Sequence, residues 1–550
     1  MRILISGANG QLGREFQELA RSNGHNEWFF LGRNQFDLSD LQSIQLAIER
    51  VNPDVLINAG AYTAVDKAEE EVELAEKING QAVKIMSELA LERDFLLIHF
   101  STDYVFHGAS GTPWKEADLR SPKGVYAKSK MAGEDALLNS KARSILIRTA
   151  WVFSSFGNNF VKTMLRLGAG RKELSVVADQ VGCPTYAKDL ALASMNFIEK
   201  QEKIKGPEVF HFCNSSTTNW AKFATKIMEL GERDCTINAI PSSEYPTAAE
   251  RPPYSVLDCT KFEEFSGQPI RSWEAALQDC LLQINDATML EKIDSEVLLN
   301  ICEIAGDEIM DVYEGDDFNV ELKGDDSPLT MADKRANDVI VANLELHYPE
   351  IPILSEETKA AEYEVRKDWD YFWLVDPLDG TKEFIKRNGE FTVNIALIHG
   401  GRVVAGYIYV PATREFYYAK KGCGTHYRKR EDAEAVKLER SAVTGDTIRV
   451  AASRSHLNEA TSAFVEELKK TYKNVELVAA GSSLKLCLIA KNVIDVYPRL
   501  APTMEWDTGA GQIVVEEAGG KVLQHENGNA VQYNKVDLLN PYFVASVSNY

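Results

Sequence analysis

The sequence lacks several features that would place it in a specialised class of protein. No apolar run approaches the roughly 20 residues that cross a bilayer, so we expect no membrane span. The eight cysteines include no CxxC pair, which argues against a thiolate zinc site and a disulfide framework. No apolar segment followed by a small-residue cleavage site stands near the N-terminus. We therefore expect a cytoplasmic protein whose cysteines are reduced and lie mostly in the core.

Basic residues are scarce relative to acidic ones. The 60 Lys and Arg against 82 Asp and Glu give a net charge of -22. Affinity for a nucleic-acid backbone comes from clustered Lys and Arg, so we expect no nucleic-acid partner and take small molecules as the binding partners. The excess of acid is explained by solubility alone, or else by carboxylates gathered around cations.

The chain also lacks a Gly/Ser or Pro linker, although its 550 residues exceed what one hydrophobic core usually supports. Two domains are expected. The segment LLQINDATMLEKID begins a helical pattern that continues without interruption through Tyr313. The boundary is therefore predicted near residues 284–289, with domains at 1–285 and 289–550.

Short apolar runs alternate with helical patterns in the first 150 residues. The runs are RILIS, WFFLG, VLINAG, FLLIHFS and SILIRTA. Repeated βαβ units predict an α/β fold with a Rossmann-type, doubly wound parallel sheet, and the turn-rich residues 151–283 suit a small substrate lobe. Beyond the boundary, a helix over 332–347 and the strand-like runs YFWLVD, FTVNIALI and RVVAGYIYV predict a mixed α+β domain.

The stretch GANGQLG places Gly7, Gly10 and Gly13 between a strand and a helix. Glycines there let backbone N–H groups approach a pyrophosphate at the positive end of the helix dipole, although a structural turn that binds nothing has the same pattern. After the second strand, Arg33 stands near where an NAD site would carry Asp or Glu. Arginine favours a 2′-phosphate and hence NADPH, with NADH possible, unless Arg33 is merely an exposed loop residue.

Thr102 and Asp103 end the FLLIHFS strand, and Tyr126 and Lys130 follow in YAKSK. A Tyr and a Lys four apart share a helix face, so the ammonium can lower the phenol pKa and prepare it for proton donation. The spacing alone is common by chance, and its value lies in its position after the glycine turn.

These stretches, with VLINAGAYTAVDKAE, STDYVFHG, RTAWVFS, DQVGCPTYAKDLA and RPPYSVLD, resemble the extended short-chain dehydrogenases/reductases, in particular those that reduce dTDP-4-dehydrorhamnose. The resemblance implies hydride transfer from NADPH to C4 of a dTDP-sugar, with proton donation by Tyr126, assisted by Lys130 and Thr102. The implied cofactor contacts are Gly7, Gly10, Gln11, Leu12, Gly13, Arg33, Asp37, Leu38, Ala59, Gly60, Ala61, Tyr62, Tyr126 and Lys130. The implied substrate contacts are Thr102, Asp103 and Trp151.

Two positions need comment beside this resemblance. His107 stands where the family usually has Asp, which we expect to affect loop packing more than chemistry. Family members can form homodimers through a helix that carries an equivalent of Glu15, sometimes with Mg²⁺. A homodimer through the reductase domain is therefore possible, but we interpret Glu15 as a surface carboxylate.

A second constellation is VDPLDGT, in which Pro377 fixes a turn so that Asp376, Asp379 and the carbonyl of Leu378 can face one point. Such hard oxygen donors suit Mg²⁺, whereas His and Cys suit zinc. A turn without metal is the alternative. Further carboxylates stand at Asp333, Glu356 and Asp507, and a cluster of this kind is favourable only around cations.

The order LTMAD, SEE, DPLDGT and WDTGAG resembles the lithium-sensitive, Mg²⁺-dependent phosphatases that include inositol monophosphatases, and SRSH, GSSLK, YPR and EWDT narrow this to the 3′(2′),5′-bisphosphate nucleotidases. The implied fold is a layered α/β sandwich. The implied metal ligands are Glu356, Asp376, Leu378, Asp379 and Asp507, while Asp333 and Thr381 orient water. The implied contacts for adenosine bisphosphate are Glu356, Gly380, Thr381, Ser453, His456, Gly481, Lys485 and Asp507, although His456 also suits a buried structural role.

Three alternatives stay open. The first half can reduce another 4-keto-6-deoxy sugar nucleotide, or it can bind nucleotide without turnover and regulate the phosphatase. The second half can act on inositol or sugar phosphates.

Overall fold

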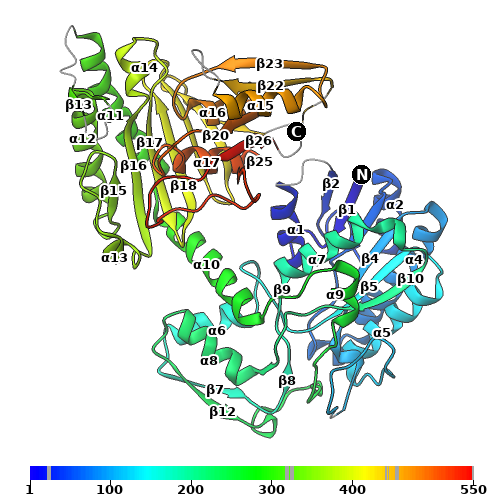
Figure 1. Cartoon of the computed structure of the whole chain (residues 1–550). Coiled ribbons are helices and arrows are strands. Elements are labelled where there is room, and N and C mark those ends of the chain that lie inside the picture. The colour runs from blue at the N-terminus through cyan, green and yellow to red at the C-terminus, as the bar shows by residue number, and fades with distance from the viewer. Residues whose placement is uncertain are drawn as a thin grey trace. The chain divides into compact units, whose positions relative to one another are not determined.

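A computed structural model describes residues 1–21, 26–108, 110–315, 321–322, 328–439, 443, 445–452 and 458–547. The chain forms two compact units, one with Met1–Ala20 and Asn26–Ile284 and one with Asn285–Tyr550 (Figure 1). None of the helices in the described ranges combines the length and apolar content needed to cross a bilayer. Independent folding of residues 1–285 and 289–550 stays a prediction.

The first unit is built on a six-stranded, wholly parallel sheet with the strand order β10-β5-β4-β3-β1-β2. Its strands are β1 (Arg2–Ser6), β2 (Glu27–Leu31), β3 (Val55–Asn58), β4 (Leu96–Thr102), β5 (Ser144–Thr149) and β10 (Pro207–His211). Successive strands are added toward one edge of the sheet from β1 to β2 and toward the other edge from β3 onward, so the strand order changes direction between β1 and β3. Ligands of such sheets bind at the carboxyl ends of the strands beside that point. The predicted doubly wound sheet is confirmed.

Helices cover both faces of this sheet because successive side chains of each strand point to opposite sides. Ile3 and Ile5 pack with α1 (Gln11–Arg21), α7 (Ala187–Glu199) and α9 (Thr260–Ser266). Leu4 packs on the other side with α2 (Leu41–Val51), α4 (Ala82–Arg93) and α5 (Gly124–Asn139). Ahead of α4 run η1 (Lys67–Glu69), α3 (Val72–Glu76) and a π-helical turn, η2 (Lys77–Gln81). Two buried cores thus hold the sheet in place.

A smaller lobe follows within the same unit. Its helices α6 (Phe160–Gly168) and α8 (Trp220–Leu230) pack on the parallel pair β7 (Glu173–Val177) and β12 (Thr236–Ile240). Two short pairs complete it: β6 (Val152–Phe153) with β9 (Thr185–Tyr186), and β8 (Val181–Gly182) with β11 (Thr218–Asn219). Short 3-10 turns lie at η3 (Asp103–Val105), η4 (Gln201–Lys203) and η5 (Ser242–Glu244). A small lobe is thus present over residues 151–283 as expected, and its role in binding substrate stays a prediction.

The helical pattern at the predicted boundary differs from the expectation. Helix α10 (Trp273–Lys292) begins before residues 284–289 and runs through them, and α11 (Ser295–Glu314) is a separate helix. Asp294 causes the break, because its side chain accepts a hydrogen bond from the backbone N–H of Glu296 and so begins a new helix as an N-cap. The predicted uninterrupted helix through Tyr313 is therefore wrong.

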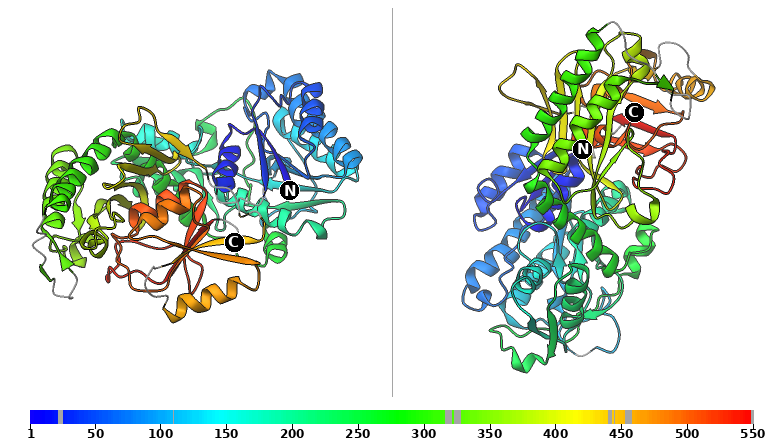
Figure 2. Two further views of the ribbon diagram at one scale, coloured as in Figure 1. Left: turned by 90° about the horizontal axis from the view of Figure 1, so that it is seen from above. Right: turned by 90° about the vertical axis from the view of Figure 1, so that its left-hand side faces the viewer.

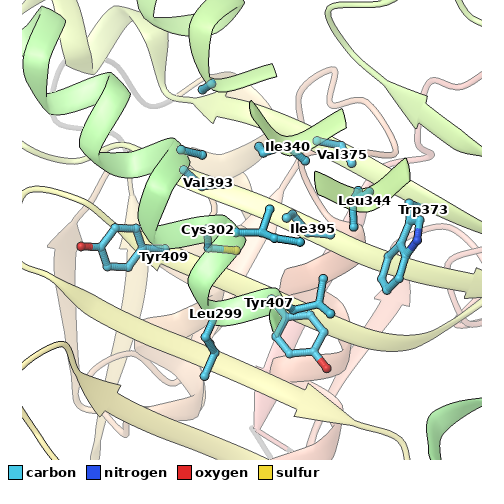
Figure 3. Close-up of a cluster of buried hydrophobic side chains, with 14 of the residues drawn as sticks. Leu299, Cys302, Ile340, Leu344, Trp373, Val375, Val393, Ile395, Tyr407 and Tyr409 are labelled. Atoms are coloured by element: carbon cyan, nitrogen blue, oxygen red, sulfur yellow. The ribbon is translucent and has the colours of Figure 1, made fainter. Parts of the chain in front are cut away.

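The second unit contains a seven-stranded sheet in the sequential order β15 to β21. Its strands are β15 (Ile353–Ser355), β16 (Tyr371–Asp379), β17 (Thr392–His399), β18 (Arg402–Val410), β19 (Glu415–Lys420), β20 (Gly424–Lys429) and β21 (Val436–Leu438). Helices α11 and α12 (Met331–His347) lie side by side over one face (Figures 1 and 2). Figure 3 shows Leu299 and Cys302 of α11 and Ile340 of α12 packed on Trp373 and Ile395 of the sheet.

The opposite face of this sheet packs on α16 (Leu484–Ala490) and α17 (Gly509–Glu517). These helices also pack on a five-stranded sheet of β23 (Asn474–Ala479), β22 (Thr447–Ala452), β24 (Val496–Arg499), β26 (Phe543–Val547) and β25 (Gly520–Gln524), whose outer face carries α15 (Glu459–Leu468). The remaining elements are α13 (Tyr363–Arg366), α14 (Thr381–Ile385) and the pair β13 (Glu321–Leu322) and β14 (Pro328–Leu329). The predicted layered sandwich is confirmed.

Candidate functional sites

The glycine turn after β1 is too crowded for other residues. Gly7 has a φ of 66°, and the N–H of Gly10 donates to its carbonyl over 2.9 Å. A Cβ on Gly7 would lie 2.7 Å from the backbone nitrogen of Gly60, and one on Gly13 would lie 2.4 Å from the Gly7 oxygen. The turn leads into α1 at Gln11 and Leu12. Backbone N–H groups therefore stand at a helix N-terminus, at the carboxyl ends of β1 and β3.

The other predicted cofactor contacts line the same edge. Leu38 contacts Gly60, where a Cβ would lie 2.8 Å from a leucine methyl group. Arg33 is exposed, and its Nε lies 3.5 Å from Oδ2 of Asp37, whose Oδ1 accepts from the N–H and hydroxyl of Ser39. Ala59 and Ala61 flank Gly60 in the segment after β3. This segment is held at Tyr62, whose backbone N–H donates a hydrogen bond to Oδ1 of Asn79. Arg33 is thus exposed at this edge and pairs there with Asp37.

Tyr126 lies on α5 close to Thr102 and Asp103, which follow one another at the end of β4. Burial raises the pKa of Tyr126 to about 12, a hydrogen bond with Thr102 lowers it, and the charge of Asp103 raises it. Burial raises the pKa of Asp103 to about 6. Hydrogen bonds from Ser255 and Thr102 lower this pKa but do not offset the effect of burial. The structure brings these three predicted residues together.

Lys130 lies one helical turn from Tyr126 and is fully buried. Its Nζ donates to the carbonyl of Phe100 over 2.7 Å and lies 3.4 Å from Nε2 of His99. Burial lowers the pKa of Lys130 to about 8, and the nearby charge of Glu134 raises it. The expected lowering of the Tyr126 pKa is not found, because burial of the phenol outweighs the interactions that favour its ionised form.

Trp151, the predicted substrate-stacking residue, lies in the left-handed region with a φ of 49°. Its ring stacks on Trp220 at 3.7 Å between centroids, and a Cβ on Gly182 would lie 2.7 Å from its indole. One face of the indole is therefore already covered by protein. Nε2 of His107 lies 3.1 Å from Oε1 of Glu250 in another loop, and the expectation that His107 affects packing more than chemistry stays a prediction.

The interpretation of Glu15 as a surface carboxylate is wrong. Its side chain is 1% exposed and accepts a hydrogen bond from the hydroxyl of Ser154 over 2.6 Å. Burial raises the pKa of Glu15 from 4.5 to about 7, while Ser154 and the charge of Lys188 lower it. Glu15 shares a helix face with the buried Leu12 and Phe16, which turns it inward.

We expect Glu15→Gln to stabilise the protein at alkaline pH. The folded chain holds the proton on Glu15 up to about pH 7, whereas the unfolded chain releases it near pH 4.5. The protonated Glu15 carboxyl therefore stabilises the folded chain fully below its unfolded-state pKa of 4.5. This stabilisation is lost as the pH rises through its folded-state pKa of about 7. Urea unfolding near pH 8 should give Glu15→Gln a free energy of unfolding roughly 1–3 kcal/mol above that of the unmodified chain. This difference should vanish near pH 4. The exposed Glu88→Gln is the control, and an equal gain at both pH values would contradict the buried carboxyl.

The second candidate site gathers carboxylates from three separate segments. Single oxygens of Glu356, Asp376 and Asp507 all lie within 4.8 Å of one another. Glu356 follows β15, Asp376 lies in β16 and Asp507 precedes α17. The ladder between β16 and β17 shifts register between Asp376 and Asp379, as the turn at Pro377 requires. Such oxygen donors could together hold a divalent cation.

The electrostatics of this cluster favour a cation. Burial raises the pKa of Asp376 well above its usual value, and the charges of Glu356 and Asp379 raise it further. Burial raises the pKa of Asp507 to about 8, and the Asp379 charge adds to this. The Oδ2 of Asp376 is buried without a hydrogen-bond partner. Like charges brought together this closely are costly unless a cation lies between them.

Asp379 lies at the end of β16 and belongs to the same electrostatic cluster. Its Oδ2 accepts a hydrogen bond from the backbone N–H of Ser483. Burial raises the pKa of Asp379 to about 6, whereas the charge of Lys485 lowers it. The neighbouring Leu378 carbonyl accepts from the hydroxyl of Thr381 over 3.4 Å.

Asp333 and Thr381 meet beside the cluster, although they come from different elements. The Thr381 hydroxyl donates to Oδ1 of Asp333 over 3.2 Å. Thr330 donates to Oδ2 of Asp333 through both its N–H and its hydroxyl, in a capping box at the start of α12. The cap fixes the Asp333 carboxylate against Thr381, as a pair that orients water would need.

A cavity of about 510 Å³ reaches Asp379 and Asp507 of this cluster. The predicted residues Asp379, Gly380, Gly481, Lys485 and Asp507 line it, together with Lys382, Lys386 and Arg499, which were not predicted as site residues. Gly380 has a φ of 94°, and a Cβ on Gly481 would lie 2.9 Å from the carbonyl of Glu390. Basic side chains thus face the acidic cluster. Ser453 and His456 lie outside the described residues.

Comparisons with known proteins divide the chain in the same way. Residues 1–285 match the RmlD substrate binding domain family and residues 291–549 the inositol monophosphatase family. The dTDP-4-dehydrorhamnose reductase of Aggregatibacter actinomycetemcomitans is 40% identical over 287 residues, which is 50% of this chain and 97% of that protein. The crystal structure of such a reductase from Clostridium acetobutylicum is 35% identical, with 52% of this chain and 100% of that one covered at a TM-score of 0.50. CysQ from Bacteroides thetaiotaomicron, a bacterial member of the inositol monophosphatase family, is 42% identical, with 46% and 98% covered at a TM-score of 0.42.

Proposed function

We propose a function for each half from the premise that the chain belongs to the RmlD substrate binding domain family through residues 1–285 and to the inositol monophosphatase family through residues 291–549. The first half is an NADPH-dependent reductase that converts dTDP-4-dehydro-L-rhamnose to dTDP-L-rhamnose. The second is a Mg²⁺-dependent phosphatase that hydrolyses adenosine 3′,5′-bisphosphate to AMP and phosphate.

The glycine turn fits a dinucleotide, because its crowded backbone leaves N–H groups at the start of α1 and no side chain in the way. NADPH bound there supplies a hydride to the carbonyl carbon of the sugar. Tyr126 donates its phenol proton to the carbonyl oxygen, and the Thr102 hydroxyl binds the same oxygen. Lys130 restores the proton of Tyr126. The observation that carries this proposal is the meeting of Thr102 with Tyr126 at the carboxyl end of β4.

We expect Arg33→Ala to weaken the binding of NADPH more than that of NADH. The exposed guanidinium stands after β2, where it can pair with a 2′-phosphate that only NADPH carries. Titration of both cofactors against the whole chain measures the two dissociation constants, with the exposed Arg50→Ala of α2 as the control. Equal losses for the two cofactors would remove Arg33 from the 2′-phosphate site.

The carboxylate cluster fits Mg²⁺, because it offers only hard oxygen ligands and holds one buried oxygen without a partner. Glu356, Asp376, Asp379, Asp507 and the Leu378 carbonyl would hold the metal. Mg²⁺ supplies the positive charge that lets water attack a phosphate ester. Asp333 and Thr381 orient that water, and Lys485 with Arg499 attracts the phosphates of the nucleotide. The convergence of three carboxylates on one point carries this proposal.

Two assays on the whole chain test these functions. NADPH oxidation on a panel of keto-sugar nucleotides should be fastest with dTDP-4-dehydro-L-rhamnose. Phosphate release with Mg²⁺ should be faster from adenosine 3′,5′-bisphosphate than from inositol monophosphate. A preference for another keto sugar, or for inositol phosphate, would replace the corresponding substrate. NADPH binding without oxidation of any substrate would favour a regulatory first half.

A further inference from the structure

Three polar residues occupy neighbouring positions at the centre of the parallel sheet, where apolar side chains are expected. Ser6 of β1 is in register with Asn58 of β3, and Asn58 is in register with His99 of β4. None of the three is more than 1% exposed. A buried polar group costs free energy unless it is hydrogen-bonded, so such a row needs a partner at each step. The row ends at Lys130.

The hydrogen bonds give this row a direction. Oδ1 of Asn58 accepts from the Ser6 hydroxyl over 2.6 Å and from the N–H of Gly60 over 3.3 Å. The amide NH₂ of Asn58 therefore faces Nδ1 of His99, 3.0 Å away, and donates to it. Burial and the charge of Lys130 both lower the pKa of His99 well below its usual value, so the ring is neutral. A neutral imidazole carries one hydrogen, and here that hydrogen lies on Nε2.

Nε2 of His99 lies 3.4 Å from Nζ of Lys130. The same Nζ donates to the Phe100 carbonyl. An ammonium group has only donors, so its protons oppose an N–H that points at it, whereas a neutral amine has a lone pair that can accept. The row therefore favours the neutral form of Lys130.

We propose that His99 is a positioning residue that controls the protonation of Lys130: Ser6 and Asn58 hold its N–H toward the amine, which weakens the hold of Lys130 on its proton. This inference rests on the proposed reductase function. After Tyr126 gives its proton to the sugar oxygen, the Lys130 ammonium transfers a proton to the phenolate and becomes a neutral amine, which then takes a proton from water. An ammonium that holds its proton weakly makes this transfer easier.

Other charged and titratable groups face this pair and oppose or support the effect. Glu134, which is fixed by Arg148 and Arg120, raises the pKa of Lys130. Burial has the larger, opposite effect and brings that pKa to about 8. Asp103 and Tyr126 approach from the end of β4 and from α5. Removing the His99 N–H should leave these groups in place and so raise the pKa of Lys130.

The first test is the pH profile of kcat for NADPH-dependent reduction, from about pH 6 to pH 10. Activity should fall as pH rises through the Lys130 pKa. His99→Phe keeps the ring but loses the N–H, and His99→Asn can still bond to Asn58. In each variant, the pH at which kcat falls should rise by about one unit. His99→Gln, whose amide can present an N–H to Lys130, should leave it in place. A lower kcat at every pH with an unmoved fall in both His99→Phe and His99→Asn would reduce His99 to a packing residue and overturn the proposal.

A second readout does not depend on activity. The folded pKa of Lys130 is about 8 against an ordinary 10.5, so the unfolded chain takes up a proton between these values and stability rises with pH across that window. The free energy of unfolding in urea should rise less with pH across this window for His99→Asn than for the unmodified chain. An equal rise would contradict the proposal. If the unmodified chain is not a reductase, it will oxidise NADPH with none of the keto-sugar nucleotides tested. The pH dependence of urea unfolding still decides the role of His99 in that case.

Discussion

Asp379→Asn is expected to abolish Mg²⁺-dependent phosphate release from adenosine 3′,5′-bisphosphate. Asn keeps the shape of the side chain and can still accept the N–H of Ser483, but it removes a negative charge from a buried cluster built to hold cations. Removing a residue that only hydrogen-bonds to a metal ligand typically lowers metal affinity or activity by roughly 10- to 100-fold, so removing the charge of a residue that would hold the metal itself should cost more.

Two controls accompany this substitution. NADPH-dependent reduction by the same protein should be unchanged, which shows that the substitution acts only on the second unit, and the far-UV circular dichroism of the whole chain should match that of the unmodified protein, which shows that this unit is folded. Asp338→Asn places the same substitution on an exposed position of α12 and should leave phosphate release intact. A comparable rate for Asp379→Asn with saturating Mg²⁺ would mean that Asp379 does not hold the metal and only accepts the backbone N–H of Ser483.

Tyr126→Phe is expected to reduce NADPH-dependent reduction by roughly a hundredfold or more, the usual contribution of a general acid. The variant keeps the ring against Tyr104 and loses only the hydroxyl that bonds to Thr102. The initial rate of NADPH oxidation measures the loss, and phosphate release should stay unchanged.

The neighbouring tyrosine offers a matched control for this change. Tyr104 contacts the Tyr126 ring edge to face at 5.6 Å between centroids, and Tyr104→Phe removes a hydroxyl from the same region. Its reductase activity should stay within a few-fold of normal. Near-normal reduction by Tyr126→Phe would assign the proton donor to another group.

The parts of both sites that follow strand ends were predictable from the sequence. Gly7, Thr102 and Asp376 each stand directly after or within an apolar strand, and parallel or adjacent strands bring their ends to one edge. The chemistry of each motif then follows from residue type and order. The sheet of the first unit and the layers of the second follow from the same runs.

Other features depend on contacts between distant residues and left little trace in the sequence. Glu15 is buried because Ser154, far along the chain, lies against it. The row from Ser6 to His99 exists only when β1, β3 and β4 are in register. The break between α10 and α11 had a local signal, because Asp294 precedes Ser295 and Glu296 as an N-cap would, yet the apolar pattern continues across it.

The claim that one chain holds two separate active sites is tested most directly by assaying one purified preparation of the whole protein for both reactions. NADPH oxidation with dTDP-4-dehydro-L-rhamnose and Mg²⁺-dependent phosphate release from adenosine 3′,5′-bisphosphate should both be present in the unmodified chain. Tyr126→Phe should remove only the first reaction and Asp379→Asn only the second. Absence of either reaction from the unmodified chain, or loss of both through one substitution in a folded protein, would contradict two independent sites.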